Sequence, residues 1–164
     1  MNVHVSYPEI VGNDEQWLDA DEAAAWLSLS TLLVVLPPVL DSRMQAVAEL
    51  THFEYLVLSR LSEVPGRSMR ISELAAFSHG SLSRMSHLVK RLEGRGWVRR
   101  ETCADDARST EAVLTDEGYA KVVETAPHHL AAVRDLVISR LTRTQLHQLH
   151  TVAGRLTEGV TPHR

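Results

Sequence analysis

Basic and hydroxyl side chains gather between Ser81 and Arg100, and their types and spacing could bind a negatively charged partner. The segment, SLSRMSHLVKRLEGRGWVRR, holds six bases against one acid, although the 164-residue chain has a formal net charge of −4. Residues 67–100 contain eight bases and two acids, whereas residues 1–66 contain two bases and ten acids. A basic block in an acidic chain is typical of a surface that binds a polyanion. Chance clustering of solvated charge is the alternative.

The apolar residues of this segment predict a helix with one face in a core. They recur at three- and four-residue spacing: Leu82, Met85, Leu88, Val89 and Leu92. The other positions offer hydrogen-bond donors and no acid: Ser81, Ser83, Arg84, Ser86, His87, Lys90 and Arg91. Such a helix fits the major groove of double-stranded DNA. Arg84 is our candidate for a guanine contact because its planar guanidinium matches two acceptors. An ordinary amphipathic surface helix is the alternative.

Other chemistry has weaker support. No GxSxG, HExxH, P-loop or dinucleotide-binding fingerprint occurs, so we expect neither an enzyme nor a bound cofactor. The single cysteine, Cys103, excludes an intramolecular disulfide and a CxxC metal site. We expect it to be exposed at a loop tip and to be a bystander, since nearby Asp105 and Asp106 disfavour its thiolate.

Nine histidines are many for this length, and some are spaced so that zinc could bind. These are His128, His129, His147 and His150. Surface or interface histidine is the simpler interpretation, and we predict no metal site. Separately, Trp26, His52, Phe53 and Tyr55 could line a small-ligand pocket, with core or dimer packing as the alternative.

A long first helix is expected over residues 19–50. Its acidic start suits a helix N-terminus, and Pro37 and Pro38 should kink or break it. Its middle is apolar nearly all round, so burying it requires a partner subunit. The longest apolar stretch, Leu32–Leu40, is too short to span a bilayer, and the N-terminus lacks the pattern of a signal peptide. We therefore expect a cytoplasmic protein that does not bind membranes.

Capping residues and breakers divide the remaining chain. Thr51 and Glu54 form a capping box for a helix to Leu61. An extended piece, Met69–Ile71, precedes a short helix capped by Ser72, and Ser81 caps the basic helix to Glu93.

After Gly96 the spacing of apolar residues is no longer that of a helix and becomes typical of β-strands. Trp97–Glu101 and Glu111–Leu114 read as a β-hairpin with a polar tip. Thr115 caps a helix to about Arg140, interrupted near Pro127, and a capping box of Thr142 and Gln145 opens a last helix to about Leu156.

This order predicts a mainly α fold with a small β-hairpin wing, a winged helix-turn-helix. We divide the chain into an acidic arm (1–18), an N-terminal dimerisation helix (19–50), a DNA-binding region (51–115) and C-terminal dimerisation helices (116–164).

The segments ISELAAF, SRMSHLVKRLEGRGWVRR, DDAR and VLTDEG together resemble the MarR (multiple-antibiotic-resistance regulator) family of bacterial transcription regulators. The resemblance covers roughly residues 20–156 and is strongest from Ile71 to Gly118. It implies a homodimer with one winged helix per subunit and terminal helices that intertwine. It also implies a repressor released by a small, often aromatic or phenolic, effector.

Three further DNA-binding residues follow from the resemblance. Asp106 and Arg108 match the family's wing pair, in which the arginine enters the minor groove and the carboxylate orients it. Arg100 matches the arginine that ends the first wing strand. The chain has Ala104 where the family often has proline, which affects the rigidity of the wing.

We therefore expect a homodimeric, ligand-responsive repressor that binds an inverted-repeat operator. One alternative is a metal- or redox-responsive regulator that uses histidines or Cys103. The other is a helical interaction protein without DNA affinity.

Overall fold

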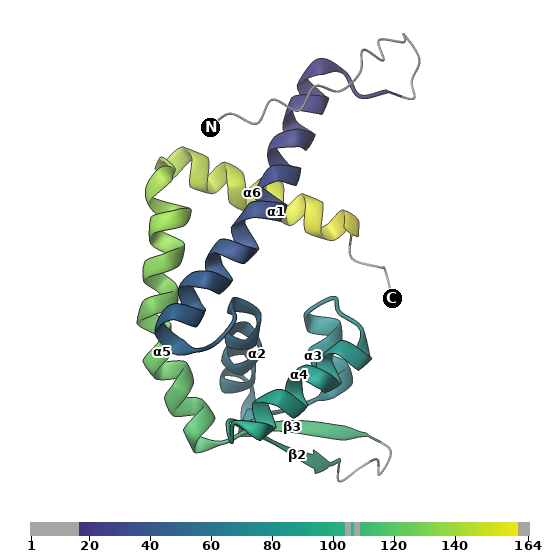
Figure 1. Ribbon diagram of the computed structural model, residues 1–164. Helices are drawn as coiled ribbons and strands as arrows, with labels where there is room; N and C mark the ends of the chain where they lie inside the picture. Colours follow the sequence, from purple (N-terminus) through teal and green to yellow (C-terminus); the bar gives the residue numbers. More distant parts are fainter. Residues whose placement is uncertain (1–16, 104–105, 107–108, 161–164) are drawn as a thin grey trace. The chain divides into compact units, whose positions relative to one another are not determined.

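The computed structural model describes residues 17–103, 106 and 109–160 (Figure 1). The chain divides into two compact units, Met1–Val39 and Leu40–Arg164. One helix, α1 (Ala20–Ala48), contains the boundary between them.

Local hydrogen bonds start α1. Asp19 Oδ1 accepts the amides of Asp21 and Glu22 at 2.8 Å, and Glu22 Oε2 accepts the amide of Asp19 at 2.9 Å. The helix then runs through Pro37 and Pro38, so a break there, one of the two outcomes that we predicted, does not occur. Each proline removes only its own amide donor, and the hydrogen bonds of the other residues carry the helix past both.

Most of the apolar surface of α1 is uncovered in the single chain. Leu33 is 61% exposed and Val34 is 72% exposed. Because the helix is continuous, it is long and apolar enough to cross a membrane, which our reading of Leu32–Leu40 did not anticipate. A helix that another protein surface covers passes the same test of length and composition.

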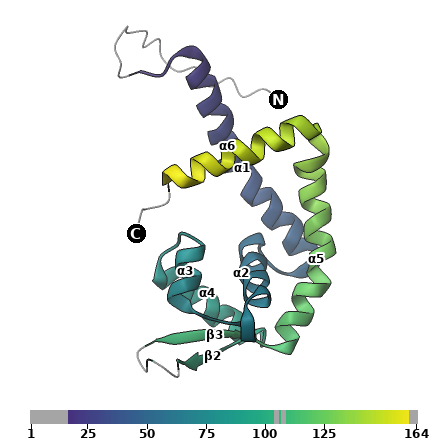
Figure 2. The same ribbon diagram turned by 180° about the vertical axis from the view of Figure 1, so that it is seen from behind.

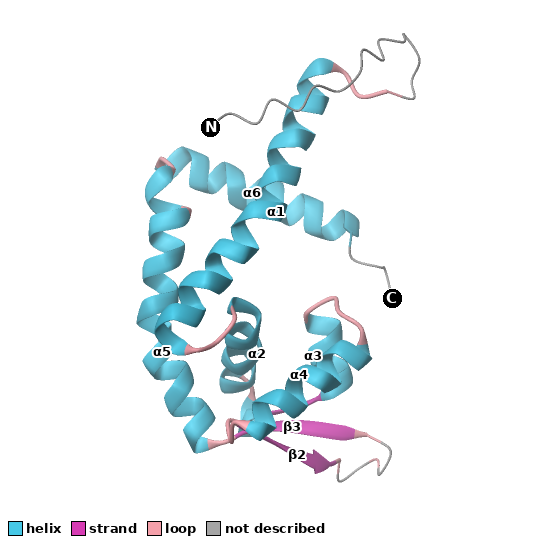
Figure 3. Cartoon of the chain, viewed as in Figure 1, coloured by secondary structure: helices cyan, strands magenta, loops and turns pink. Residues whose placement is uncertain are grey.

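The second unit is a helical core with a small sheet, and it confirms the predicted fold class (Figures 1 and 3). The strands pair antiparallel in the order β1-β3-β2. Its elements are α2 (His52–Glu63), η1 (Pro65–Arg67), β1 (Ser68–Arg70), α3 (Ile71–Phe77), α4 (Leu82–Gly94), β2 (Val98–Thr102), β3 (Thr110–Leu114), α5 (Asp116–Leu136), η2 (Ile138–Arg140) and α6 (Arg143–Val160).

Most predicted helix starts are confirmed. The Thr51 hydroxyl accepts the Glu54 amide at 3.1 Å while the Glu54 carboxylate accepts the Thr51 amide at 2.8 Å. Side chains of Ser81 and Thr115 likewise cap α4 and α5. Gln145 accepts the Thr142 amide at 2.9 Å at the start of α6.

Two helix predictions need correction. The α3 helix begins at Ile71, and Ser72 does not cap it. The Glu73 carboxylate instead accepts the amide of Arg70 at 3.2 Å, and the helix starts two residues earlier than expected. Pro127 lies inside α5 without interrupting it, and the helix ends at Leu136.

The short extended piece before α3 joins the wing as its third strand. Ser68 pairs with Val113 and Arg70 with Glu111, so β3 is the central strand. At the other end of the wing, the amide of Thr115 donates to the Trp97 carbonyl at 3.1 Å. These contacts attach the hairpin to both α3 and α5, which limits how far it can swing.

Candidate nucleic-acid interface

The second helix of the α3–α4 pair carries most of the predicted DNA-binding residues. Between the two helices, His79 has a φ of 50°, which turns the chain sharply before Ser81 caps α4. The β2–β3 hairpin extends beside this pair of helices (Figures 1 and 2). The unit thus places one exposed helix and one polar hairpin next to each other.

The apolar stripe of α4 anchors it as predicted, with one exception. Met85, Leu88, Val89 and Leu92 are buried. Leu82 is 56% exposed, so its place in the predicted core stripe was wrong. It is the first residue of the helix and lies beyond the end of the core.

The face opposite that stripe is polar. Ser83, His87 and Lys90 are exposed at its centre, at four- and three-residue spacing. Ser81 is also exposed and Ser86 is half-buried. The face therefore offers hydroxyl, imidazole and ammonium groups without an acid among them.

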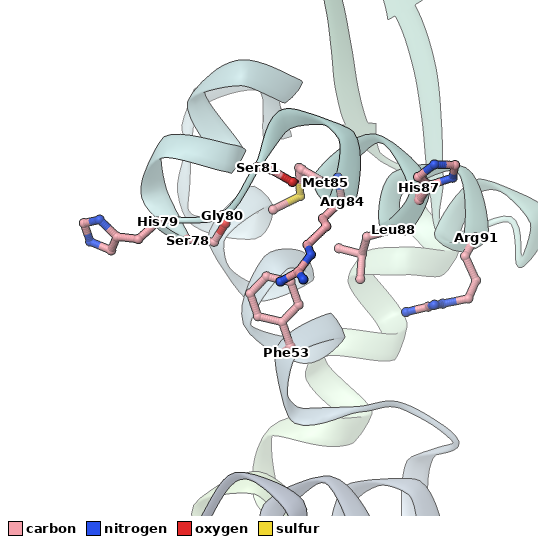
Figure 4. A pocket seen from close by; sticks show the side chains of 10 residues that line it. All are labelled: Phe53, Ser78, His79, Gly80, Ser81, Arg84, Met85, His87, Leu88 and Arg91. Atoms are coloured by element: carbon pink, nitrogen blue, oxygen red, sulfur yellow. Dashed lines mark hydrogen bonds between the residues drawn. The ribbon is translucent and has the colours of Figure 1, made fainter. Parts of the chain in front are cut away.

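Arg84 lies on the flank of α4, where it borders a groove of about 540 Å³ between α4 and the start of α2. In Figure 4 its guanidinium points toward the ring of Phe53. The groove is lined by Phe53, Ser78, His79, Gly80, Ser81, Arg84, Met85, His87, Leu88 and Arg91. In this conformation Arg84 is aligned with the groove rather than with the centre of the polar face.

Arg91 lies on the same flank and pairs with a buried carboxylate. Its Nε donates to Glu54 Oε1 at 2.7 Å, and Glu54 is 1% exposed. Burial alone would raise the pKa of Glu54, but the hydrogen bond from the Thr51 amide and the contact with Arg91 together lower it. We missed Glu54 as a partner of this arginine because its capping box already accounts for a glutamate at that position.

Arg100, on β2, is held against α4 in a similar way. Its Nε donates to Glu93 Oε2 at 2.7 Å and its amide donates to Glu93 Oε1 at 3.2 Å. The neighbouring Arg99 pairs with Glu101 on the same strand. Glu93 therefore links the end of α4 to the first wing strand, a role that its position within the basic segment did not suggest.

The described part of the wing tip is held by local hydrogen bonds. Asp106 is exposed, and its carboxylate accepts the Ser109 hydroxyl at 2.6 Å. The Ser109 amide also donates to the Asp106 carbonyl at 2.9 Å. Its predicted partner, Arg108, lies outside the described residues.

Cys103 is buried, so our expectation of an exposed thiol was wrong. Its amide donates to the Ser109 carbonyl at 3.0 Å, which extends the hairpin past the strand ends. Burial and the neighbouring Glu111 raise the pKa of the thiol, although Arg70 on β1 opposes this shift. The third strand brings Arg70 beside the thiol, an arrangement that we had not predicted.

The four predicted ligand residues do not form one pocket. His52 stacks on His129 of α5 with ring centroids 5.2 Å apart, and Tyr55 packs on the same ring at 4.6 Å. Phe53 instead borders the groove of Arg84. Trp26 belongs to the first unit and is 55% exposed.

The described residues contain no group of three His, Cys, Asp or Glu side chains that could hold a metal ion. Among the predicted zinc candidates, His128, His147 and His150 are exposed. The stacked pair of His52 and His129 contributes only two histidines.

Comparisons with known proteins identify the fold. The MarR family model matches residues 50–110. A crystal structure of Sco3205, a MarR family transcriptional regulator from Streptomyces coelicolor in complex with DNA, is 41% identical. The match covers 92% of this chain and 94% of Sco3205, with a TM-score of 0.86. The chain belongs to the MarR family of transcriptional regulators.

Curated relatives named as HTH-type transcriptional regulators agree with this assignment. The repressor Rv2887 of Mycobacterium tuberculosis is 29% identical over 137 residues, which cover 84% of this chain and 96% of the repressor. The regulator PecS of Dickeya dadantii is 32% identical over 74 residues, 45% of this chain and 44% of PecS. The family and fold predicted from the sequence are therefore confirmed, and the family consists of transcription regulators rather than enzymes.

Proposed function

We propose that this MarR-family protein is a homodimeric repressor that binds an inverted-repeat operator in the cytoplasm. The observation that carries the proposal is the acid-free, exposed face of α4 beside the β2–β3 wing. The similarity to Sco3205, whose structure contains DNA, supports DNA binding by this chain. The DNA-binding region would be residues 51–115, with dimerisation helices on either side.

In this proposal α4 enters the major groove. Ser83 and His87 near its centre would meet base edges, and Lys90 would meet a phosphate. Arg84 can reach a guanine if its side chain turns away from Phe53. Ser81, Ser86 and Arg91 would contribute at the edges of the groove.

The wing would contact the adjacent minor groove. Arg108 would enter it, oriented by Asp106, because a narrow minor groove attracts guanidinium groups. Arg100 is held by Glu93 through Nε, and its side chain is 37% exposed. Its terminal nitrogens are thus suited to a backbone contact.

A second copy of the chain would cover the apolar surfaces that the single chain leaves exposed. These lie on α1, where Leu33 and Val34 are uncovered, and on α6, where Val152 and Leu156 are 53% and 48% exposed. A twofold-symmetric dimer would present two α4 helices to two half-sites, which is the reason to expect an inverted repeat.

Release of the operator by a small aromatic or phenolic effector is a further part of the proposal. The groove beside Phe53 offers an aromatic ring, while Arg84 and Arg91 offer positive charge. A ligand bound there would occupy Arg84 and compete with DNA. Titration of the operator complex with benzoate and with phenol tests this. If neither compound releases the DNA, the result argues against an effector of this kind.

Selection of bound duplexes from a random pool tests the central proposal. We expect an inverted repeat whose half-sites are about one helical turn, 10 base pairs, apart from centre to centre. Enrichment of one unpaired half-site would contradict the dimer. No enrichment, together with no salt-dependent shift of genomic fragments, would favour a helical interaction protein. Copurified zinc, or loss of binding on oxidation, would favour the metal- or redox-responsive alternative.

A further inference from the structure

Glu54 is a buried acid that contacts Arg91 on the flank of α4, beside the face that would bind DNA. In the described part of the chain, the buried polar side chains are those of Glu54 and Thr125. Each carboxylate oxygen of Glu54 has its own partner. Oε2 accepts the Thr51 amide at 2.8 Å, and Oε1 accepts Arg91 Nε at 2.7 Å. The same side chain thus caps α2 and holds an arginine of α4.

The contact at Nε leaves most of the guanidinium free to act elsewhere. Arginine has five N–H donors, and four of them belong to its two terminal nitrogens. The Arg91 side chain is 56% exposed although its Nε is paired with a buried group. Figure 4 shows Arg91 on the same side of α4 as Arg84. The Arg91 side chain is therefore held at Nε by Glu54, while the rest of its guanidinium can contact another group.

We propose that Glu54 is a positioning residue for DNA binding, which holds Arg91 through Nε so that its terminal nitrogens meet a phosphate at the edge of the major groove. This inference rests on the proposed function. An exposed arginine loses rotamer freedom when it binds a phosphate, and a side chain ordered beforehand loses less. Because Glu54 also caps α2, it sets the position of Arg91 relative to that helix.

The direction in which Glu54→Gln changes the operator affinity separates positioning of Arg91 from a simple effect of charge. Glu54→Gln keeps the side-chain volume and can still accept the Thr51 amide, since glutamine serves in capping boxes. Removing a negative charge near DNA should by itself strengthen binding. If Glu54 positions Arg91, the operator affinity should instead fall about fivefold, the size of one lost net hydrogen bond.

The partner residue provides an independent test. In an Arg91→Gln background, Glu54→Gln should cause no further loss, because the two residues act as one unit. Arg91→Lys keeps the charge, but a single ammonium cannot pair with Glu54 and reach a phosphate as a guanidinium fork can. Arg91→Lys should therefore lose as much affinity as Arg91→Gln. Adding Glu54→Gln to Arg91→Lys should then tighten binding by freeing the ammonium.

The experiment measures the affinity of the full-length dimer for one selected operator at fixed salt, with thermal melts of every variant. Glu63→Gln is the matched control: it lies on the same helix and forms an exposed ion pair with Arg60 at 3.6 Å. It should leave affinity unchanged. If Glu54 had only a structural role, Glu54→Gln would weaken binding in every background. It would then also weaken binding, rather than tighten it, in the Arg91→Lys background.

Two results would overturn the inference while the proposed function stands. One is equal or tighter binding by Glu54→Gln in a folded protein. The other, which applies even if Glu54→Gln fails to fold, is wild-type affinity in Arg91→Lys. Failure of the wild-type protein to bind any duplex would overturn the proposed function itself, and the inference with it.

Discussion

Arginines of this MarR-family protein differ in what holds them in place. Arg91 and Arg100 each donate Nε to a glutamate at 2.7 Å, whereas Arg84 points toward an aromatic ring. A guanidinium held at Nε can still donate from its other end, so such pairing does not withdraw an arginine from DNA binding. For the base contact that we propose, Arg84 would have to turn out of the groove.

Substitutions on α4 should distinguish base reading from phosphate binding. We expect Arg84→Ala to relax base preference, because a bidentate base contact contributes about 1–3 kcal/mol of discrimination. Lys90→Ala should weaken binding to all DNA sequences similarly. It should also reduce the slope of log affinity against log salt concentration by roughly one. Affinities for the operator and for single-base variants, each over a salt series, check both effects. Equal loss of specificity in both variants would contradict the assignment.

The wing pair should behave as one unit. Arg108→Ala should weaken operator binding, and Asp106→Ala should weaken it too, although it removes an acid that repels phosphate. The double variant should be little worse than Arg108→Ala alone. Affinity measurements over this four-member cycle at fixed salt, with melts as a folding control, provide the test. Tighter binding by Asp106→Ala would show that the acid does not orient Arg108.

The stacked histidines should make stability depend on pH. Burial lowers the pKa of both His52 and His129 below the ordinary value of 6.5. The unfolded chain therefore takes up protons at a higher pH than the folded chain, so the free energy of unfolding should decrease as pH falls below about 6.5. Urea unfolding between pH 7.5 and pH 5 at one protein concentration measures this.

Two variants locate that effect. His129→Phe preserves an aromatic ring for stacking and should flatten the dependence on pH, whereas His128→Ala, at an exposed neighbour, should retain it. Keeping the pH above 5 separates the histidines from Glu54, whose lowered pKa means that its contribution is lost only below the ordinary value of 4.5. An unchanged pH profile in His129→Phe would rule out this origin.

At the scale of elements, the start of α5 is packed against the backbone of Trp97, the residue that precedes β2. A Cβ added to Gly118 would lie 2.0 Å from the Trp97 carbonyl oxygen, so the backbones approach as closely as glycine allows. We expect Gly118→Ala to destabilise the protein by about 3 kcal/mol or more, because backbone would have to move. Urea unfolding followed by circular dichroism measures the loss.

Gly94→Ala is the control for that prediction. A Cβ at Gly94, the last residue of α4, would meet no atom within 4 Å. It should be neutral or slightly stabilising, since alanine favours helix more than glycine does. Similar losses in both variants would mean that the contact with Trp97 does not restrict this position.

At the scale of the whole molecule, the uncovered apolar side chains of α1 and α6 predict an obligate dimer. Light scattering at micromolar concentration should give twice the mass of 18.3 kDa. Val34→Glu should weaken the dimer by placing a charge among buried apolar groups. A stable wild-type monomer would contradict this, and flotation of the protein with lipid vesicles would indicate that a membrane covers α1 instead.

Sequence alone determined what depends on neighbours within a few residues. The caps at Thr51, Ser81, Thr115 and Thr142 are hydrogen bonds across three residues, so residue types at fixed spacing predict them. The apolar stripe of α4 and the hairpin follow from equally local periods. Their order was sufficient to predict the winged helix-turn-helix.

Only the tertiary structure decided which distant groups meet. Glu54 and Arg91 are 37 residues apart in the sequence. Ser68 and Val113, which pair in the sheet, are also far apart in the sequence. Local spacing carries no information about such contacts, because they form only when the core packs these elements together. The same packing buries Cys103. Tertiary context thus overrides local expectations at these sites.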